Sequence, residues 1–186
     1  MDLQLAQDTL VRAWQADQHR VWELDWPAAP IGGLLTVETW RSAERYRFEI
    51  LESTAPALIG QILIFDGQTA WWDNRFDQDL PQPASSPTLS PVSDAFAIIE
   101  TLLTSSPIAA TRQDDTLLNY GPTSKISLTF EDENTLSFWL ESKTNLPVRI
   151  FFSVGDSQAV LHARQVEPLI DPPAGLFRPD HLSPRR

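Results

Sequence analysis

Five aspartates are the side chains that could most readily supply acid and base chemistry. They lie in polar stretches of the chain and are Asp73, Asp77, Asp79, Asp114 and Asp115. Acid–base catalysis needs two such groups held at a reacting centre in different environments. Aspartate also favours turns, because its side chain bonds to nearby backbone N–H groups. We therefore interpret all five as solvated turn residues and predict no catalytic residue.

Metal and cofactor chemistry finds equally little support. The histidines His19, His162 and His181 are far apart in the sequence, and no pair has the spacing of two ligands on one helix face. The chain has no cysteine, which excludes disulfides, thiolate nucleophiles and thiolate metal sites. No glycine-rich phosphate loop, HExxH, GxSxG or EF-hand pattern occurs. The sequence therefore predicts no metal site and no cofactor.

The charge balance limits the partners. The chain has 14 basic and 25 acidic side chains, a formal net charge of −11, and the basic residues are scattered. Nucleic acid is therefore not an expected partner, and anionic lipid headgroups would repel the surface. The longest nearly apolar run, residues 58–65, is far shorter than the roughly 20 residues that cross a bilayer. No transmembrane segment is predicted in this chain.

The tryptophan content is the most informative feature of the composition. Large aromatic side chains can fill an ordinary core, or they can form the walls of an apolar hollow. Neighbouring residues on a strand face opposite ways, so the pair Trp71 and Trp72 needs two covered faces or leaves one aromatic exposed. We expect something to cover the second face. The seven tryptophans are Trp14, Trp22, Trp26, Trp40, Trp71, Trp72 and Trp139.

The elements that must position these residues follow from the hydrophobic period. Residues 2–18 have apolar side chains at three- and four-residue steps and predict an amphipathic helix. The period then changes to two, which predicts strands. Asp66 and Gly67 form a turn pair between two strand-like runs, so those runs predict a hairpin. The expected strands of this half are residues 19–26, 34–40, 45–51, 58–65 and 68–72.

The second half repeats this pattern. Residues 80–91 are rich in proline and predict a loop. Ser93 is the expected N-cap of a helix that ends at Thr104. Four further strands are expected at residues 126–130, 136–140, 148–152 and 160–166. Together these are about nine strands and two helices in a single domain, residues 1–186, which is an α+β arrangement with the helices on one face of a curved antiparallel sheet.

Six short motifs, three in each half of the chain, carry a resemblance to a known family. The first half contains residues 33–41 (GLLTVETWR), 46–49 (YRFE) and 62–73 (ILIFDGQTAWWD). The second half contains residues 136–140 (LSFWL), 145–149 (NLPVR) and 175–177 (GLF). In this order they resemble the LolA/LolB-like outer-membrane lipoprotein carrier superfamily, which includes RseB-type regulators.

The resemblance implies an unclosed half-barrel whose helices cover the concave face and an apolar cavity that accepts lipid acyl chains. It also implies a periplasmic or other extracytoplasmic location. The residues after Met1 do not form a signal peptide, so such a location needs a signal or anchor outside this sequence. Arg41 corresponds to the arginine that contacts the lid in the carriers. A solvated arginine at a strand end is the other interpretation of Arg41.

Our first hypothesis is a binding protein, not an enzyme, that holds lipid acyl chains or a lipoprotein and acts in transport. The alternative is a sensor or regulatory domain of the same fold, RseB-like, that binds a protein partner at the membrane without a transport role. An enzyme whose site is not visible in the sequence is a third possibility. The candidate ligand-binding residues are Trp22, Leu24, Leu35, Val37, Phe48, Ile50, Leu63, Phe138 and Ile150.

Overall fold

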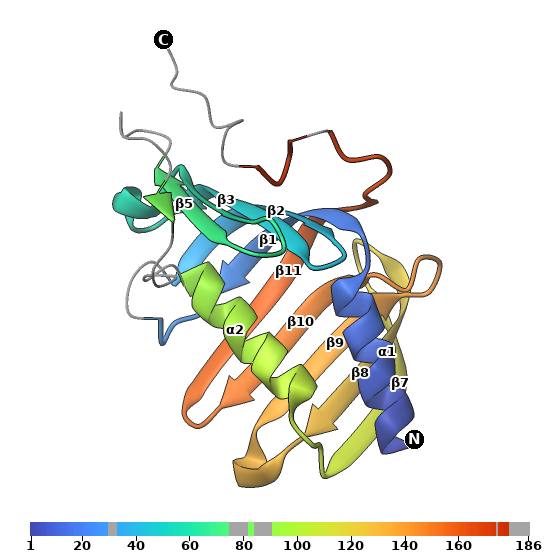
Figure 1. Cartoon of the computed structure of the whole chain (residues 1–186). Coiled ribbons are helices and arrows are strands. Elements are labelled where there is room, and N and C mark those ends of the chain that lie inside the picture. Colours follow the sequence, from blue (N-terminus) through green and yellow to red (C-terminus); the bar gives the residue numbers. More distant parts are fainter. Residues whose placement is uncertain (30–32, 75–81, 84–90, 174, 179–186) are drawn as a thin grey trace.

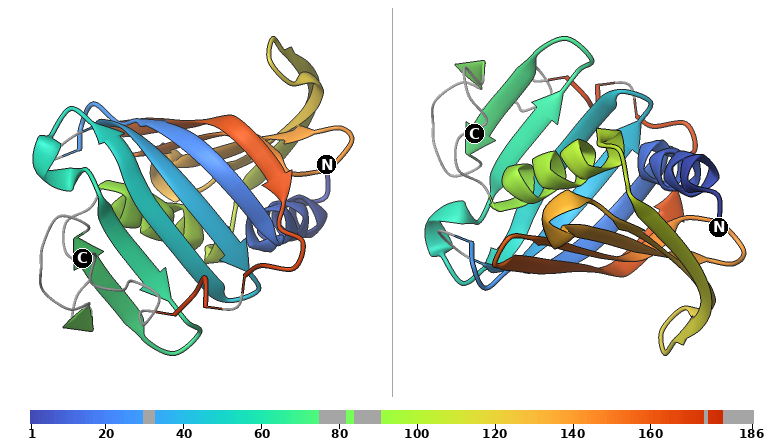
Figure 2. Two further views of the ribbon diagram at one scale, coloured as in Figure 1. Left: turned by 90° about the horizontal axis from the view of Figure 1, so that it is seen from above. Right: turned by 90° about the horizontal axis from the view of Figure 1, so that it is seen from below.

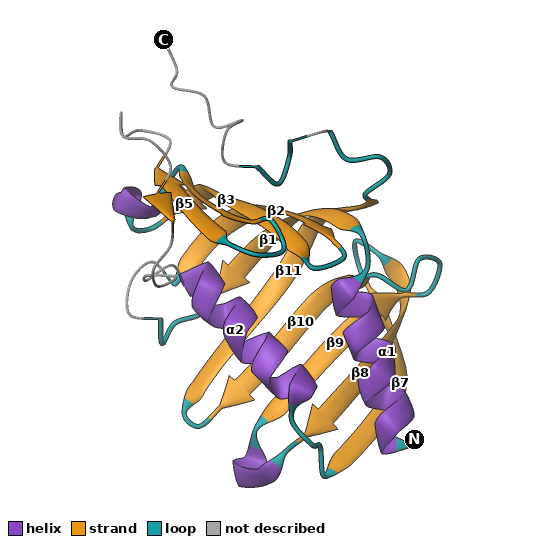
Figure 3. Cartoon of the chain, in the orientation of Figure 1, coloured by secondary structure: helices purple, strands orange, loops and turns teal. Residues whose placement is uncertain are grey.

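The computed structural model describes residues 1–29, 33–74, 82–83, 91–173 and 175–178. These residues form one antiparallel sheet of eleven strands and two α-helices (Figure 1, Figure 3). The sheet curls strongly, and both helices lie on its concave side (Figure 2). The predicted α+β half-barrel is confirmed.

The first half of the chain supplies one helix and six strands. Helix α1 (Leu3–Gln15) begins after Asp2, whose Oδ1 accepts a hydrogen bond from the backbone N–H of Leu5 at 2.9 Å. This is the usual N-cap arrangement, which satisfies a free N–H group of the first turn. A short 3₁₀ helix, η1 (Pro56–Leu58), follows the third strand. The strands are β1 (Gln18–Asp25), β2 (Leu34–Ser42), β3 (Arg45–Ser53), β4 (Gln61–Phe65), β5 (Ala70–Asn74) and β6 (Gln82–Pro83).

The second half supplies the other helix and five strands. Helix α2 (Pro91–Thr104) begins at a proline, which is well suited to the first turn because it has no N–H group to leave unsatisfied. A second 3₁₀ helix, η2 (Glu131–Glu133), joins two of the strands. The strands are β7 (Ala109–Leu117), β8 (Gly121–Thr129), β9 (Thr135–Glu141), β10 (Pro147–Val154) and β11 (Ser157–Pro168).

The sheet consists of two meanders that meet at one seam. The strand order is β6-β5-β4-β3-β2-β1-β11-β10-β9-β8-β7, so neighbours in the sheet are also neighbours in sequence except at the pair β1 and β11. That pair runs from Gln18 opposite Pro168 to Asp25 opposite Val160, with a register shift between Val21 and Trp22. Strands β6 and β7 form the two edges, so the described sheet is open.

The concave face holds the main apolar core. Burial alternates along β1, where Trp22 and Leu24 are buried and Asp25 is exposed, as the two-residue period of a strand requires. On β11 the small and apolar residues Ala159, Leu161 and Ala163 face inward. The helices bury their apolar stripes on the same side, with Ala6, Leu10, Ala13 and Trp14 from α1 and Val92, Ala95, Ile99, Leu102 and Leu103 from α2.

The convex face of β4 carries a second, smaller apolar cluster. Ile62, Ile64 and Phe177 are its buried members, and Trp71 packs against them. Trp72, by contrast, packs against the concave core. The expectation that something covers the second face is therefore confirmed: the covering residues are Leu169, Leu176 and Phe177, from the segment after β11.

Some predicted boundaries are wrong for local reasons. The first helix ends at Gln15, not at residue 18, because Ala16 is extended with ψ of 145°. The fourth strand begins at Gln61, since Leu58 belongs to η1 and Gly60 has a positive φ of 79°. Ser93 is not an N-cap but lies inside α2, which begins at Pro91.

Two further expectations need comment. Strand β7 was not expected, because it is an edge strand with mostly exposed side chains and shows no apolar alternation. The proline-rich loop of residues 80–91 lies mostly outside the described residues; within it, Gln82–Pro83 forms β6 and Pro91 begins α2.

Candidate functional site

A cavity of about 120 Å³ lies between the two helices and strands β1 to β4. Both helices and four strands contribute to it, so it exists only in the assembled fold. Its walls are mainly apolar and aromatic, with charged groups on α2, β2 and β3. The lining residues are Trp14, Gln18, Trp22, Thr39, Trp40, Arg41, Tyr46, Arg47, Phe48, Leu63, Ser93, Phe96, Ala97 and Glu100.

Phe96 of α2 is the centre of the aromatic wall. Its ring lies edge-on to the ring of Trp14, with centroids 5.2 Å apart, and edge-on to the ring of Phe48 at 6.1 Å. The Trp14 ring is also edge-on to the ring of Phe138, with centroids 6.2 Å apart. Such edge-to-face pairs fix the orientation of the rings as well as burying area. The three elements α1, α2 and β3 therefore meet through aromatic contacts at the cavity.

Glu100 joins two of these elements to β2 by polar contacts. Its Oε1 accepts a hydrogen bond from Arg41 Nη2 at 3.2 Å and another from Trp14 Nε1 at 3.3 Å. The Arg41 guanidinium also lies over the Trp14 ring, 5.2 Å from its centroid. Burial raises the pKa of the neighbouring Tyr46, and the negative charge of Glu100 raises it further. These contacts connect β2, α1 and α2 at the cavity.

Arg41 of β2 thus contacts α2, which lies on the concave side of the sheet. Its side chain is 16% exposed, against 47% for that of Glu100, so Arg41 is not a fully solvated strand-end arginine.

The structure divides the nine predicted ligand-binding residues into two groups. Trp22, Phe48 and Leu63 line the cavity. The other six are buried in the same concave core but are not among the residues that line the cavity: Leu24, Leu35, Val37, Ile50, Phe138 and Ile150.

Several lining residues were not predicted. Tyr46 and Phe96 carried a usable signal, because Tyr46 alternates with Phe48 on a strand and Phe96 lies on the apolar stripe of its helix. Gln18 and Glu100 carried none, since polar residues at an element end or on a helix surface do not indicate a cavity.

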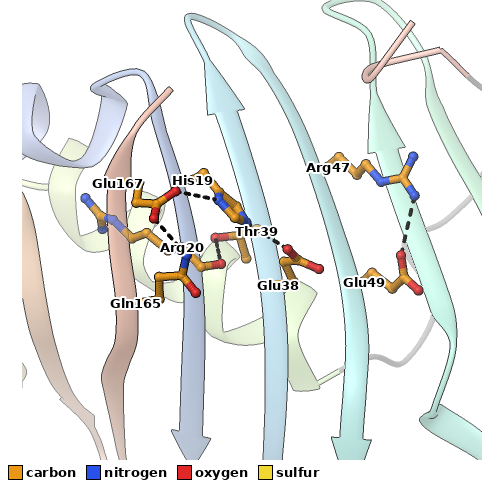
Figure 4. Close-up of polar contacts among 8 residues, drawn as sticks. All are labelled: His19, Arg20, Glu38, Thr39, Arg47, Glu49, Gln165 and Glu167. Atoms are coloured by element: carbon orange, nitrogen blue, oxygen red, sulfur yellow. Dashed lines mark hydrogen bonds and ion pairs between the residues drawn. The ribbon is translucent and has the colours of Figure 1, made fainter. Parts of the chain in front are cut away.

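The polar candidates lie elsewhere. His19 is on the outer face, where its Nε2 lies 2.8 Å from Glu38 Oε1 and its Nδ1 lies 3.6 Å from Glu167 Oε2 (Figure 4). Its ring stacks on Trp40 with centroids 5.1 Å apart. His162 is exposed on β11; burial and then the positive charge of Arg149 lower its pKa.

The described aspartates do not occupy turns, contrary to expectation. Asp73 lies in β5, and Asp114 and Asp115 lie in β7. Asp77, Asp79 and His181 lie outside the described residues. Among the described residues, no three histidine or acidic side chains are grouped so that they could hold a metal ion, and no described helix is long and apolar enough to cross a membrane.

The similarity of this chain to known proteins lies in its fold. No protein-family model matches the sequence, and no curated protein matches it. Among solved structures, an uncharacterized conserved protein from Thermus thermophilus is 10% identical over 94% of this chain and 91% of that chain, with a TM-score of 0.59.

Two further solved structures are similar. MucB, in the complex of Pseudomonas aeruginosa MucA and MucB, is 15% identical over 96% of this chain, with a TM-score of 0.56. This chain covers 60% of that MucB chain. The lipoprotein LppX from Mycobacterium tuberculosis is 12% identical over 91% of this chain and 99% of that chain, with a TM-score of 0.54. At these identities the likeness shows a shared fold and no more.

Proposed function

We propose that this chain, as a single domain, binds lipid acyl chains or the acyl chains of a lipoprotein between α2 and the concave face of the sheet. The observation that carries the proposal is the aromatic cavity lined by Trp14, Trp22, Phe48 and Phe96. Ligand pockets for apolar molecules are concave, mainly apolar and supplied with a few polar groups. We also propose that the domain acts outside the cytoplasm, in the periplasm or at a membrane surface, and binds without catalysis. The lipoprotein LppX, which has the same fold, supports the location.

The size of the cavity indicates what binding requires. An engineered cavity of about 150 Å³ holds a molecule the size of benzene. The cavity of about 120 Å³ therefore accepts a ring or a short alkyl segment, and a whole acyl chain needs more room. We propose that α2 moves away from the sheet to provide it, and that the Arg41–Glu100 contact is the lid contact that opens.

Mass spectrometry under native conditions tests the proposal. Purified protein should carry co-purifying lipid, and organic solvent should extract it. Ala97→Trp should reduce lipid occupancy, because Ala97 is an exposed residue of α2 that lines the cavity, so the larger side chain can enter it without disturbing the core. The matched control is Ala109→Trp at an exposed position of the edge strand β7. The proposal would be contradicted if purified wild-type protein carried no lipid and also failed to bind added lipid.

Regulation through a protein partner is the second candidate. MucB, which shares the fold, has been solved in a complex with MucA. If this chain acts only as such a regulatory domain, a partner should bind it with equal affinity whether or not Ala97→Trp fills the cavity. Equal loss of lipid binding and partner binding in that variant would instead show that partner binding depends on the cavity.

A further inference from the structure

Arg20 is an arginine in the interior of the concave face. It lies on β1 between Gln18 and Trp22 and is 0% exposed. In Figure 4 its guanidinium extends away from the carboxylates of Glu38 and Glu49, which belong to the outer face. Charged side chains are almost never fully buried unless they are paired.

No hydrogen bond satisfies this guanidinium within the described residues. Its Nε, Nη1 and Nη2 atoms are all buried without an acceptor. The group instead lies over the ring of Trp22, 5.0 Å from its centroid. Burial lowers the pKa of Arg20, and the like charge of Arg41 lowers it further, while Tyr120 acts in the opposite direction. No carboxylate is among these influences, although the chain carries a net charge of −11.

The unpaired cation lies beside the cavity. Gln18 and Trp22, its neighbours on the same face of β1, both line the cavity, and so does Arg41. Arg41 has a buried Nε that also lacks an acceptor. The positive charges of Arg20 and Arg41 are close enough to repel each other, so an acidic group placed near both would offset the repulsion and accept hydrogen bonds from both.

Another part of the cavity wall is apolar. Phe48 and Leu63 from the sheet and Phe96 from α2 form it. A site that combines cationic donors with an aromatic and aliphatic wall matches a molecule with an acidic head and an alkyl chain.

We propose that the cavity binds a single-chain amphiphile with an acidic head group, and that Arg20 together with Arg41 binds that head group. This inference rests on the proposed function and specifies its ligand class. Because the Trp22 ring lies against the guanidinium and also lines the cavity, binding requires the Trp22 or Arg20 side chain to turn. The enlargement that an acyl chain needs provides the room.

Competition binding with three C16 probes tests the proposal. Hexadecanoate, hexadecyl phosphate and the neutral hexadecan-1-ol share one alkyl chain and differ only in the head group. Wild-type protein should bind an acidic probe about 10- to 100-fold more tightly than the alcohol, as expected for charge-assisted hydrogen bonds. Preference for the phosphate over the carboxylate would indicate a phospholipid-derived ligand, and the reverse a fatty acid; both support the acidic head group.

The variant Arg20→Met tests whether Arg20 causes the preference for acidic probes. The variant should bind the acidic probes and the alcohol with similar affinity, and its affinity for the alcohol should stay within about twofold of wild type. Without ligand it should melt at the same temperature as wild type or higher, because replacing an unpaired buried ion by an apolar side chain is often stabilising. Arg112→Met, at an exposed arginine on β7, is the matched control and should change neither quantity.

Four results would contradict the inference. Equal wild-type affinity for acids and alcohol refutes the acidic head group while leaving the proposed function intact. An acid preference that survives in Arg20→Met refutes the role of Arg20, and so does a variant that no longer folds. Failure of all three probes to bind wild-type protein refutes the proposed function as well.

Discussion

Arg41 of β2 and Glu100 of α2 are joined at the cavity by a hydrogen bond of 3.2 Å. The same carboxylate oxygen accepts from Trp14 of α1, so one acidic side chain connects both helices to the sheet. An ion pair that is partly exposed contributes only about 0–1 kcal/mol to stability. The contact is therefore weak enough to break and re-form during the ligand exchange that we propose.

Removing the charge of Glu100 should speed ligand exchange more than it affects folding. For Glu100→Gln we expect a loss of at most about 1 kcal/mol in the free energy of unfolding and faster release of a bound fluorescent acyl probe, measured by stopped-flow displacement. Arg164→Gln is the control, because Arg164 pairs with Glu23 and Glu52 on exposed side chains away from the cavity. Equal release rates in wild type and Glu100→Gln would show that this contact does not limit exchange.

The concave core should respond strongly to loss of a single side chain. Leu161 of β11 is 0% exposed, so Leu161→Ala should cost about 2–5 kcal/mol, the range for buried leucines. Leu118 is 101% exposed, and Leu118→Ala should stay within about 0.5 kcal/mol of wild type. Urea unfolding followed by circular dichroism measures both, and comparable losses would contradict the assignment of Leu161 to the core.

Asp115 should remain ionised to unusually low pH. Trp139 Nε1 donates to its Oδ2 at 2.7 Å, and this bond, followed by one from the backbone of Thr116, lowers the pKa of Asp115. A lowered folded-state pKa means stabilisation that is present above the unfolded pKa of about 3.9 and is lost as pH falls through the folded pKa. Trp139→Phe should raise the pKa of Asp115 in a carbon-detected NMR titration.

Asp66 is the internal control for that titration. Its Oδ1 accepts from the backbone N–H groups of Gln68 and Thr69 at 2.8 Å each, and these bonds lower its pKa. Trp139→Phe should leave the pKa of Asp66 unchanged. If both aspartates shift together, the substitution has altered the fold and not one hydrogen bond.

Phe177 should hold the segment after β11 against the convex face. It is 4% exposed, packs with Ile62 and Ile64, and lies under the Arg45 guanidinium at 5.0 Å. Phe177→Ala should cost about 3 kcal/mol or less, since the segment can detach locally without unfolding the sheet. Limited proteolysis should cleave the variant near its C-terminus while the cavity still binds the acyl probe. Unchanged protease resistance would argue against this role.

Much of the sheet could be predicted because its strands are half-buried. Alternation along β1 and β3 identified Trp22 and Phe48 as inward residues, and both line the cavity. Strand β7 could not be found this way, because an edge strand with exposed side chains has no apolar period. Its pairing with β8 is made by the backbone, which leaves no pattern in the side chains.

The charged part of the site was harder to predict for two different reasons. Glu100 acquires its partners only when α2 docks against β2 and α1. No local sequence pattern indicates such a contact. Arg20 did carry a signal: it shares the parity of Trp22 and Leu24 on β1, so strand geometry already placed it on the inward face. An arginine in an apolar period should be treated as a candidate ligand-binding group.

The seam between β1 and β11 has a kinetic consequence. The other strand pairs join segments that follow one another in sequence, so each meander can begin to form from local hairpins. The seam brings together residues from near opposite ends of the chain, and closing so long a loop carries an entropic penalty before any contact is gained. Folding should therefore proceed by two locally assembled halves whose docking is the slow step, and the inward positions of β1, Arg20 among them, are fixed only when that step is complete.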